Sequence, residues 1–151
     1  MDDMSRPRVL SFESRRHEEM RNLIKRHGGE PLVAPSMQEV PLSENSAAME
    51  FLKTLRLGQV DVVVFLTGVG ARGLLELVEA DCDKKEFCAL LARCAIVVRG
   101  PKPAKVMREW GVAMVGHAAE PNTWRQLIPE IERVGCRGRV IAIQEYGVPS
   151  L

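Results

Sequence analysis

The chain has 151 residues, of which 46% are hydrophobic and 27% are charged, the composition of an ordinary globular protein. A formal net charge of +1 argues against a general nucleic-acid binder, which would concentrate lysine and arginine. No apolar run approaches the roughly 20 residues that span a bilayer, and residues 1–6 lack the apolar region of a signal peptide. We therefore expect a cytoplasmic protein with neither a nucleic-acid nor a membrane partner.

The first 35 residues predict one β-α-β unit. A short strand is expected at residues 8–12, and Ser14 is the expected cap of a helix that Gly28 ends. Residues 31–35 predict a second strand. Residues 36–45 show little hydrophobic periodicity, so we expect them to form a connector.

The rest of the chain alternates between apolar strands and amphipathic helices. The expected strands cover residues 60–66, 94–98, 112–115 and 138–143. Five helices are expected. The first ends at Gly58, the second runs from the turn after residue 66 through Glu79, and the third carries residues 87–91. The fourth covers residues 101–110, and the fifth extends from Pro121 and its cap Asn122 to Val134. This alternation predicts an α/β fold with a parallel sheet and right-handed crossovers.

The segment from Val60 to Leu66 is the most informative part of the chain. Its near-continuous apolar run is typical of a strand buried on both faces of a parallel sheet. It continues into Thr67, Gly68, Val69 and Gly70, a glycine-rich turn that leads into a helix. Backbone N–H groups at such a turn carry partial positive charge and attract anions. Ligands bind at this edge of open α/β sheets, so these four residues are candidate ligand-binding residues.

Three further turns follow predicted strands and favour anions. They contain Gly100 and Lys102 after strand 94–98, Tyr146 and Gly147 after strand 138–143, and Ser14, Arg15 and Arg16 after strand 8–12. A lysine near a helix start is electrostatically disfavoured unless it serves an anion, and two arginines can clamp a carboxylate. Each turn alone is a modest signal, because simple surface exposure explains it too and is the favoured explanation for Lys102 taken singly. Because parallel strands bring their carboxyl ends to one edge, the four turns together predict a site for a polyanionic small molecule.

Gly68, Gly70 and Gly73 also match the spacing of the dinucleotide-binding fingerprint. That fingerprint expects an acidic residue at the end of the next strand, where this chain has Arg99. An arginine there would suit a 2′-phosphate, which leaves an NADP site open as an alternative. Glycines required for a tight turn and close helix packing explain the motif about as well.

The residue pattern predicts no metal site. The four cysteines contain no C-x-x-C pair, so we expect buried or incidental thiols. The three histidines stand alone, and no Ser/His/Asp array or paired carboxylate motif is present. No residue is therefore assigned a catalytic role.

The chain ends at Leu151, a few residues beyond the last predicted strand. A further helix and strand would be expected there, and the opening β-α-β unit is separated from the other units by a connector. We therefore expect incomplete domains and a fragment of a longer enzyme. An unfinished sheet would leave an exposed strand edge, which favours self-association.

Five stretches, in this order and at this approximate spacing, resemble the uroporphyrinogen-III synthase family. They are residues 14–18 (SRRHE), 29–35 (GEPLVAP), 61–70 (DVVVFLTGVG), 98–104 (VRGPKPA) and 144–149 (QEYGVP). The resemblance extends over nearly the whole chain. It implies a flavodoxin-like α/β fold, with a parallel sheet and helices on both faces, in a two-domain architecture that is incomplete here.

By this resemblance, residues 1–38 would be the β-α-β unit of an incomplete first domain plus a connector. Residues 39–151 would form the second α/β domain without its last strand. A tyrosine proposed for catalysis in the family lies in a segment that this chain lacks, so the catalytic residues stay unassigned.

Members of the family convert hydroxymethylbilane, a linear tetrapyrrole, to uroporphyrinogen III by losing water, closing the ring and inverting ring D, and they need no cofactor. The acetate and propionate groups on every pyrrole ring suit the anion-binding turns. The resemblance implies that Thr67 to Gly70 bind carboxylates, with Gly100 and Lys102 beside them. Two alternatives remain: a nucleotide-binding α/β domain that uses the Gly68–Gly73 turn, and a non-catalytic tetrapyrrole-sensing module related to the synthase.

Overall fold

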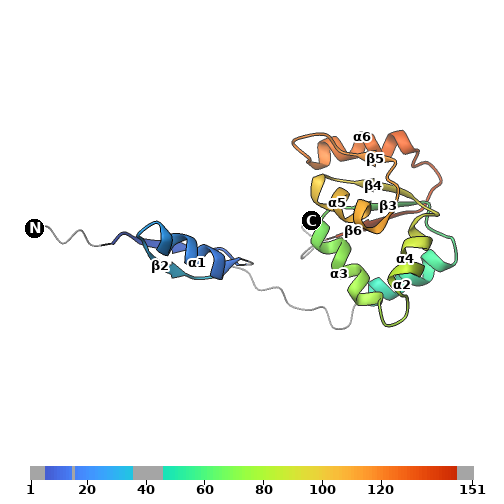
Figure 1. Ribbon diagram of the computed structural model, residues 1–151. Helices are drawn as coiled ribbons and strands as arrows, with labels where there is room; N and C mark the ends of the chain where they lie inside the picture. The colour runs from blue at the N-terminus through green and yellow to red at the C-terminus, as the bar shows by residue number, and fades with distance from the viewer. Residues whose placement is uncertain (1–5, 15, 36–45, 146–151) are drawn as a thin grey trace, which may run out of the picture. The chain divides into compact units, whose positions relative to one another are not determined.

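The computed structural model describes residues 6–14, 16–35 and 46–145. They belong to two compact units, Met1–Pro41 and Leu42–Leu151, which we call unit 1 and unit 2 and describe separately (Figure 1). The break between the units lies outside the described residues. That the two units are parts of two domains of a longer protein, divided after residue 38, stays a prediction.

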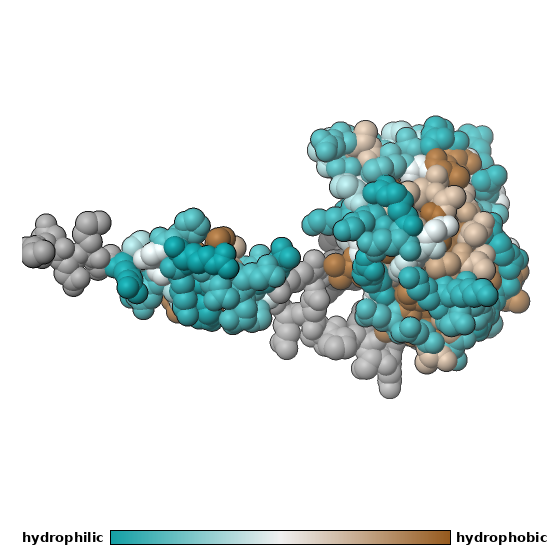
Figure 2. Space-filling model, viewed as in Figure 1, coloured by the Kyte–Doolittle hydropathy of each residue, from teal (hydrophilic) through white to brown (hydrophobic). Residues whose placement is uncertain are grey.

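Unit 1 is a β-α-β unit, as the sequence predicts. Strands β1 (Arg8–Ser11) and β2 (Glu30–Val33) pair in parallel and are joined by helix α1 (His17–Arg26). Ile24 is the one described hydrophobic residue that this unit buries. The surface of unit 1 that faces the viewer in Figure 2 is mostly hydrophilic.

Helix α1 begins later than predicted, and Ser14 is not its cap. Arg16 is the N-cap residue, and it makes no side-chain cap hydrogen bond. The Glu13 carboxylate accepts the N–H of Arg16 at 3.2 Å, while the Ser14 hydroxyl donates to the Phe12 carbonyl at 3.4 Å. The serine hydroxyl is therefore used in the turn that precedes the helix.

Unit 2 contains a four-stranded parallel sheet, which confirms the predicted sheet type. In spatial order its strands are β5 (Gly116–His117), β4 (Ala95–Val98), β3 (Val62–Phe65) and β6 (Ile141–Gln144). The strand expected at residues 112–115 is displaced toward β5, because the Val112 N–H donates to the Met107 carbonyl at 2.9 Å and helps to end the preceding helix. The last strand also begins later than residue 138, because Gly138, at φ +70°, lies in a turn.

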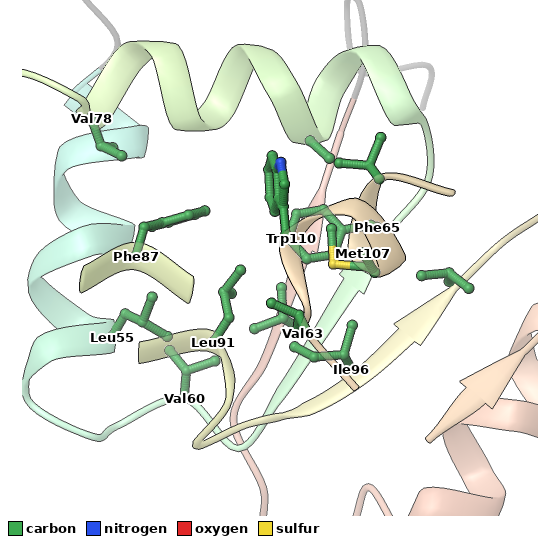
Figure 3. Packing of buried hydrophobic residues seen from close by; sticks show 14 of the residues in the cluster. Leu55, Val60, Val63, Phe65, Val78, Phe87, Leu91, Ile96, Met107 and Trp110 are labelled. Carbon is green, nitrogen blue, oxygen red and sulfur yellow. The ribbon is translucent and has the colours of Figure 1, made fainter. Parts of the chain in front are cut away.

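The described residues of unit 2 form five helices, on both faces of the sheet as predicted. They are α2 (Ser46–Arg56), α3 (Gly68–Val78), α4 (Lys84–Leu91), α5 (Pro101–Trp110) and α6 (Trp124–Val134). Helices α2 to α5 share the larger core with Val63 and Phe65 of β3 (Figure 3). Helix α6 packs through Leu127 with Val62 and Val64 in a second core.

Strand β3 is the central element that these two cores share. Its four residues are only 0–1% exposed, and β4 and β6 pair with it on either side. Burying an aliphatic or aromatic side chain stabilises a fold by roughly 1.5–3 kcal/mol. This burial on both faces explains the apolar run in the sequence.

No helix in the described ranges has the length and apolar content that crossing a bilayer requires.

An ion pair joins α2 to α4 at the surface of the larger core. Arg56 Nε donates to Glu86 Oε1 at 2.8 Å, and Arg56 Nη2 donates to the carbonyl of Asp81 at 2.6 Å. The hydrogen bond from Arg56 lowers the pKa of the Glu86 carboxyl. The pair should therefore stabilise the fold only while Glu86 is ionised.

We expect Glu86→Gln to lower the free energy of unfolding more at about pH 7 than at about pH 3. A carboxyl whose folded pKa is lowered stabilises the fold above its unfolded pKa, about 4.3, and this contribution is lost as the pH falls through the folded pKa. Urea unfolding of wild type and variant at both pH values measures the effect. Glu79→Gln, an exposed carboxylate with no ion pair among the described residues, is the control. An equal loss at both pH values for Glu86→Gln would contradict the expected linkage.

Candidate functional site

The carboxyl ends of β3, β4 and β6 form one edge of the sheet in unit 2. Phe65 of β3 pairs in register with Val98 of β4 and with Gln144 of β6. Neighbouring strands lie about 4.8 Å apart, so the turns that leave these strands at the same level lie side by side. The structure therefore brings the turn at Thr67 and the turn at Gly100 together, beside Gln144.

Thr67 opens helix α3 and shapes the first of these turns. Its extended backbone, at φ −140° and ψ 149°, lets its side-chain oxygen accept the N–H of Gly70 at 2.9 Å. The Thr67 carbonyl accepts the N–H of Ala71 at 3.1 Å. Within the part of the chain that the structure describes, the N–H groups of Gly68 and Val69 make no hydrogen bond. Two donors at the positive end of the helix are thus left for a ligand.

Gly68 allows helices α3 and α5 to approach each other closely. A Cβ built on Gly68 would lie 2.9 Å from the carbonyl oxygen of Lys102 and 3.1 Å from its carbonyl carbon. Both are backbone atoms in the first turn of α5, so they cannot move away independently of the helix. This glycine therefore has a packing role in addition to its N–H group.

Gln144, the last residue of β6, lies over the start of α3. Its Oε1 atom accepts the N–H of Thr67 at 3.2 Å, and its Nε2 group donates to the carbonyl of Glu145. A Cβ built on Gly70 would lie 2.1 Å from Gln144 Nε2. The absence of a side chain at Gly70 is what makes room for this carboxamide.

Helix α5 presents a different kind of surface at the same edge. Gly100 is its N-cap residue, and Pro101 and Pro103 lie in its first turn. Because proline has no N–H group, Lys102 supplies the one amide among the first three helical positions. Lys102 is exposed and forms no ion pair with any described residue. An anion at α5 would therefore be held chiefly by a side-chain ammonium.

The loop after β5 reaches the same edge of the sheet. Asn122, at φ 58°, lies against Gly100, where an added Cβ would be 3.3 Å from Asn122 Oδ1. Thr123 caps α6 and forms a capping box with Gln126. Asn122, the cap expected from the sequence, is therefore in the loop, one residue before the actual cap.

Comparison with known proteins establishes the family. A family model described as "Uroporphyrinogen-III synthase HemD" matches residues 18–148. The chain belongs to the uroporphyrinogen-III synthase family. The resemblance seen in the sequence is thereby confirmed.

The similar proteins are about twice as long as this chain. The wild-type uroporphyrinogen III synthase of the extremely thermophilic bacterium Thermus thermophilus is 30% identical, with a TM-score of 0.64, and the match covers 95% of this chain and 53% of that one. A mutant of a Thermus thermophilus synthase is 29% identical, with a TM-score of 0.70 and coverages of 95% and 54%. The uncharacterized protein YjjA of Bacillus subtilis (strain 168) is 29% identical over 140 residues, or 93% of this chain and 51% of the relative.

The residues expected at the synthase-family site fall into three groups. One group shares the carboxyl edge in unit 2: Thr67, Gly68, Val69, Gly70, Gly100 and Lys102. Ser14 and Arg16 belong to unit 1, where Arg16 Nε pairs with Glu19 Oε2 at 3.2 Å, and their joining this edge stays a prediction. Arg15, Tyr146 and Gly147 lie outside the described residues.

Sequence reasoning missed the two carboxamides that lie against turn glycines. Gln144 closes an apolar strand with a polar side chain, which is a usable signal for a residue at the ligand edge. Asn122 precedes the Thr123-x-x-Gln126 capping box, which would have placed it in the loop. What could not be inferred from either pattern is the glycine that each side chain contacts.

A cavity of about 320 Å³ lies at the opposite end of the strands of unit 2. Its lining includes Asp61, Arg93 and Ala95, which precede or open β3 and β4. The Asp61 carboxylate already accepts the N–H of Val140 at 2.8 Å. Because parallel α/β sheets bind ligands at the carboxyl ends of their strands, we place the candidate site at the turns and not in this cavity.

Three cysteine thiols of unit 2 are not activated as nucleophiles. Burial raises the pKa of the Cys82, Cys88 and Cys94 thiols, so they are protonated at neutral pH. Among the described residues, no three His, Cys, Asp or Glu side chains lie close enough together to hold a metal ion.

We expect Gly68→Ala to destabilise unit 2 by about 1–3 kcal/mol, because the added Cβ would press on the backbone of α5. Gly73→Ala is the matched control on the same helix, since nothing lies within 4 Å of its added Cβ. Alanine favours a helix interior by about 1 kcal/mol over glycine, so this control should be stabilising. Urea unfolding followed by circular dichroism measures both variants. A Gly68→Ala variant as stable as wild type would contradict the close approach of α3 and α5.

Proposed function

We propose that this chain supplies a carboxylate-binding edge of a uroporphyrinogen-III synthase, a lyase of tetrapyrrole and haem biosynthesis. The substrate would be hydroxymethylbilane, and the reaction its dehydration, cyclisation and ring D inversion to uroporphyrinogen III, without a cofactor. The observation that carries the proposal is a pair of N–H groups, those of Gly68 and Val69, at the carboxyl edge of a family member. Neither makes a hydrogen bond to a residue that the structure describes. Because the chain spans about half the length of its relatives, the complete reaction is proposed for the whole protein.

The chemistry of this edge suits the proposed substrate. Every pyrrole ring of the linear tetrapyrrole carries an acetate and a propionate. Backbone N–H groups at a helix N-terminus bind such anions through charge-assisted hydrogen bonds. The Lys102 ammonium at the start of α5 would bind a second carboxylate. Two anchors would restrict the conformations of a flexible linear molecule and favour closure in one geometry.

These residues would bind and orient the substrate. Their donors are backbone N–H groups and an ammonium, which hold a carboxylate without exchanging a proton with it. The proposal therefore assigns substrate binding to Gly68, Val69 and Lys102, and it assigns proton transfer to no residue in the described ranges.

The nucleotide-binding alternative receives less support from the glycine contacts. In the dinucleotide fingerprint the second glycine admits the pyrophosphate and the third allows close helix packing. Here the Gln144 carboxamide lies against Gly70, and an added Cβ at Gly73 would meet nothing within 4 Å. Gly68 has the close-packing role instead.

A tetrapyrrole-sensing module would use the same edge without turnover.

Ligand binding and turnover test the proposal separately. Trp124, 62% exposed at the start of α6, offers a fluorescence signal for anaerobic titration with uroporphyrinogen III. We expect saturable binding of this ligand and none of NADP⁺; saturable NADP⁺ binding without tetrapyrrole affinity would reverse the assignment. Chromatography of the products formed from hydroxymethylbilane measures ring D inversion. Binding without inversion would favour the sensing module for this chain.

Val69→Pro should bind uroporphyrinogen III about tenfold or more weakly than Val69→Ala, the loss expected for one hydrogen bond to a charged group. Val69 is the second helical residue of α3, a first-turn position where proline removes a donor that the helix does not use. Helix α5 already carries two prolines in its first turn. Fluorescence titration of both variants gives the two dissociation constants. Equal values would contradict binding through this N–H group.

A further inference from the structure

The carboxyl edge already holds a side chain where a ligand carboxylate would bind. We call the N–H groups of Thr67, Gly68 and Val69 the amide cradle. Gln144 Oε1 accepts the first of these, at 3.2 Å, while the other two make no hydrogen bond to a described residue. The carboxamide is held on its other side by the bond from Nε2 to the Glu145 carbonyl.

The position of Gln144 depends on the glycine beneath it. Added to Gly70, a Cβ would lie 2.1 Å from Nε2, 2.4 Å from Cδ and 2.6 Å from Oε1 of Gln144. The whole carboxamide group therefore lies against the Gly70 backbone, in the first turn of α3. Any other residue at position 70 would displace the Gln144 side chain from the cradle.

A carboxamide and a carboxylate have the same planar shape, and each can accept a backbone N–H. They differ in charge. Because the carboxamide is neutral, it accepts a weaker hydrogen bond from the N–H than a carboxylate does. A ligand carboxylate can therefore displace Gln144 from the Thr67 N–H, whereas a neutral ester or amide of similar shape gains little by doing so.

We propose that Gln144 is a specificity-determining residue of this site: its carboxamide closes the amide cradle and moves aside for an anionic carboxylate. The proposal rests on the proposed function and adds the side chain that favours ionised carboxylates of that substrate over their neutral esters. Gln144 ends its strand and is followed by the exposed Glu145, so its side chain can leave the cradle without disturbing the core.

Two substitutions at Gln144 test the proposal against uroporphyrinogen III under anaerobic conditions. Gln144→Ala removes the competing group, and its dissociation constant should fall about threefold to tenfold, the effect of one neutral hydrogen bond that the ligand no longer has to replace. Gln144→Glu places a carboxylate in the same position, and its dissociation constant should rise at least about tenfold through competition for the N–H and repulsion of the ligand. Gln59→Ala, an exposed carboxamide before the amino end of β3, is the control.

Hydrogen exchange of the Thr67 amide provides a second readout that needs no ligand. Exchange should be faster in Gln144→Ala than in wild type, while amides of β3 and β4 keep their protection and show that the variant is folded. An unchanged exchange rate at Thr67 would contradict the claim that the Gln144 carboxamide closes the cradle. The octamethyl ester of uroporphyrinogen III should bind wild type much more weakly than the free acid does. Equal binding of the two would contradict the proposed preference for ionised carboxylates.

The outcomes separate this proposal from the one on which it rests. If wild type binds uroporphyrinogen III and Gln144→Ala binds it equally or more weakly, the role of Gln144 is overturned while the proposed function stands. If neither wild type nor any Gln144 variant binds it, the proposed function fails and the role of Gln144 fails with it.

Discussion

The organisation of unit 2 depends on the burial of β3 on both of its faces. Val62 and Val64 lie in the core that α6 covers, and Val63 and Phe65 lie in the core of α2 to α5. Because side chains alternate along a strand, an apolar residue is required at every one of these positions, and a shift of one residue would exchange the two cores. The end of β3 is thereby held in the middle of the carboxyl edge, between β4 and β6.

The candidate site is a consequence of how closely this edge is packed. Three glycines take part, and each lies close to a different neighbour. Gly68 is in contact with the backbone of α5, Gly70 with the Gln144 carboxamide, and Gly100 with Asn122. Fold and site therefore share residues, so a substitution at this edge affects stability and ligand binding together. The alanine control at Gly73 and the paired substitutions at Val69 separate the two effects.

Local patterns predicted the elements of the fold that depend on local chemistry. The apolar run of β3 is visible in the sequence because burial on both faces of a strand selects apolar residues at every position. The strand expected at residues 112–115 was wrong because the N–H of Val112 is used to end α5. That choice between helix end and strand start depends on tertiary packing, which no local pattern reports.

The same distinction applies to the site. The turns at Thr67 and Gly100 could be placed on one edge because parallel strands align their carboxyl ends. Two features of the site depend on which side chains meet across the edge. Gln144 occupies the cradle of α3, and α5 offers an ammonium with a single first-turn amide. That Ser14 and Arg16 of unit 1 take part in the site stays a prediction, because it depends on how the two units are arranged.

The prolines at the start of α5 give the two halves of the edge different responses to ionic strength. At α3, backbone N–H groups would donate to a carboxylate directly, at hydrogen-bond distance. At α5, Pro101 and Pro103 have no N–H group to donate, so the exposed Lys102 would attract the carboxylate. This attraction acts through water and is screened over about 8 Å at physiological salt. Rising salt would thus release a multiply charged ligand from α5 first and leave it tethered by α3 alone.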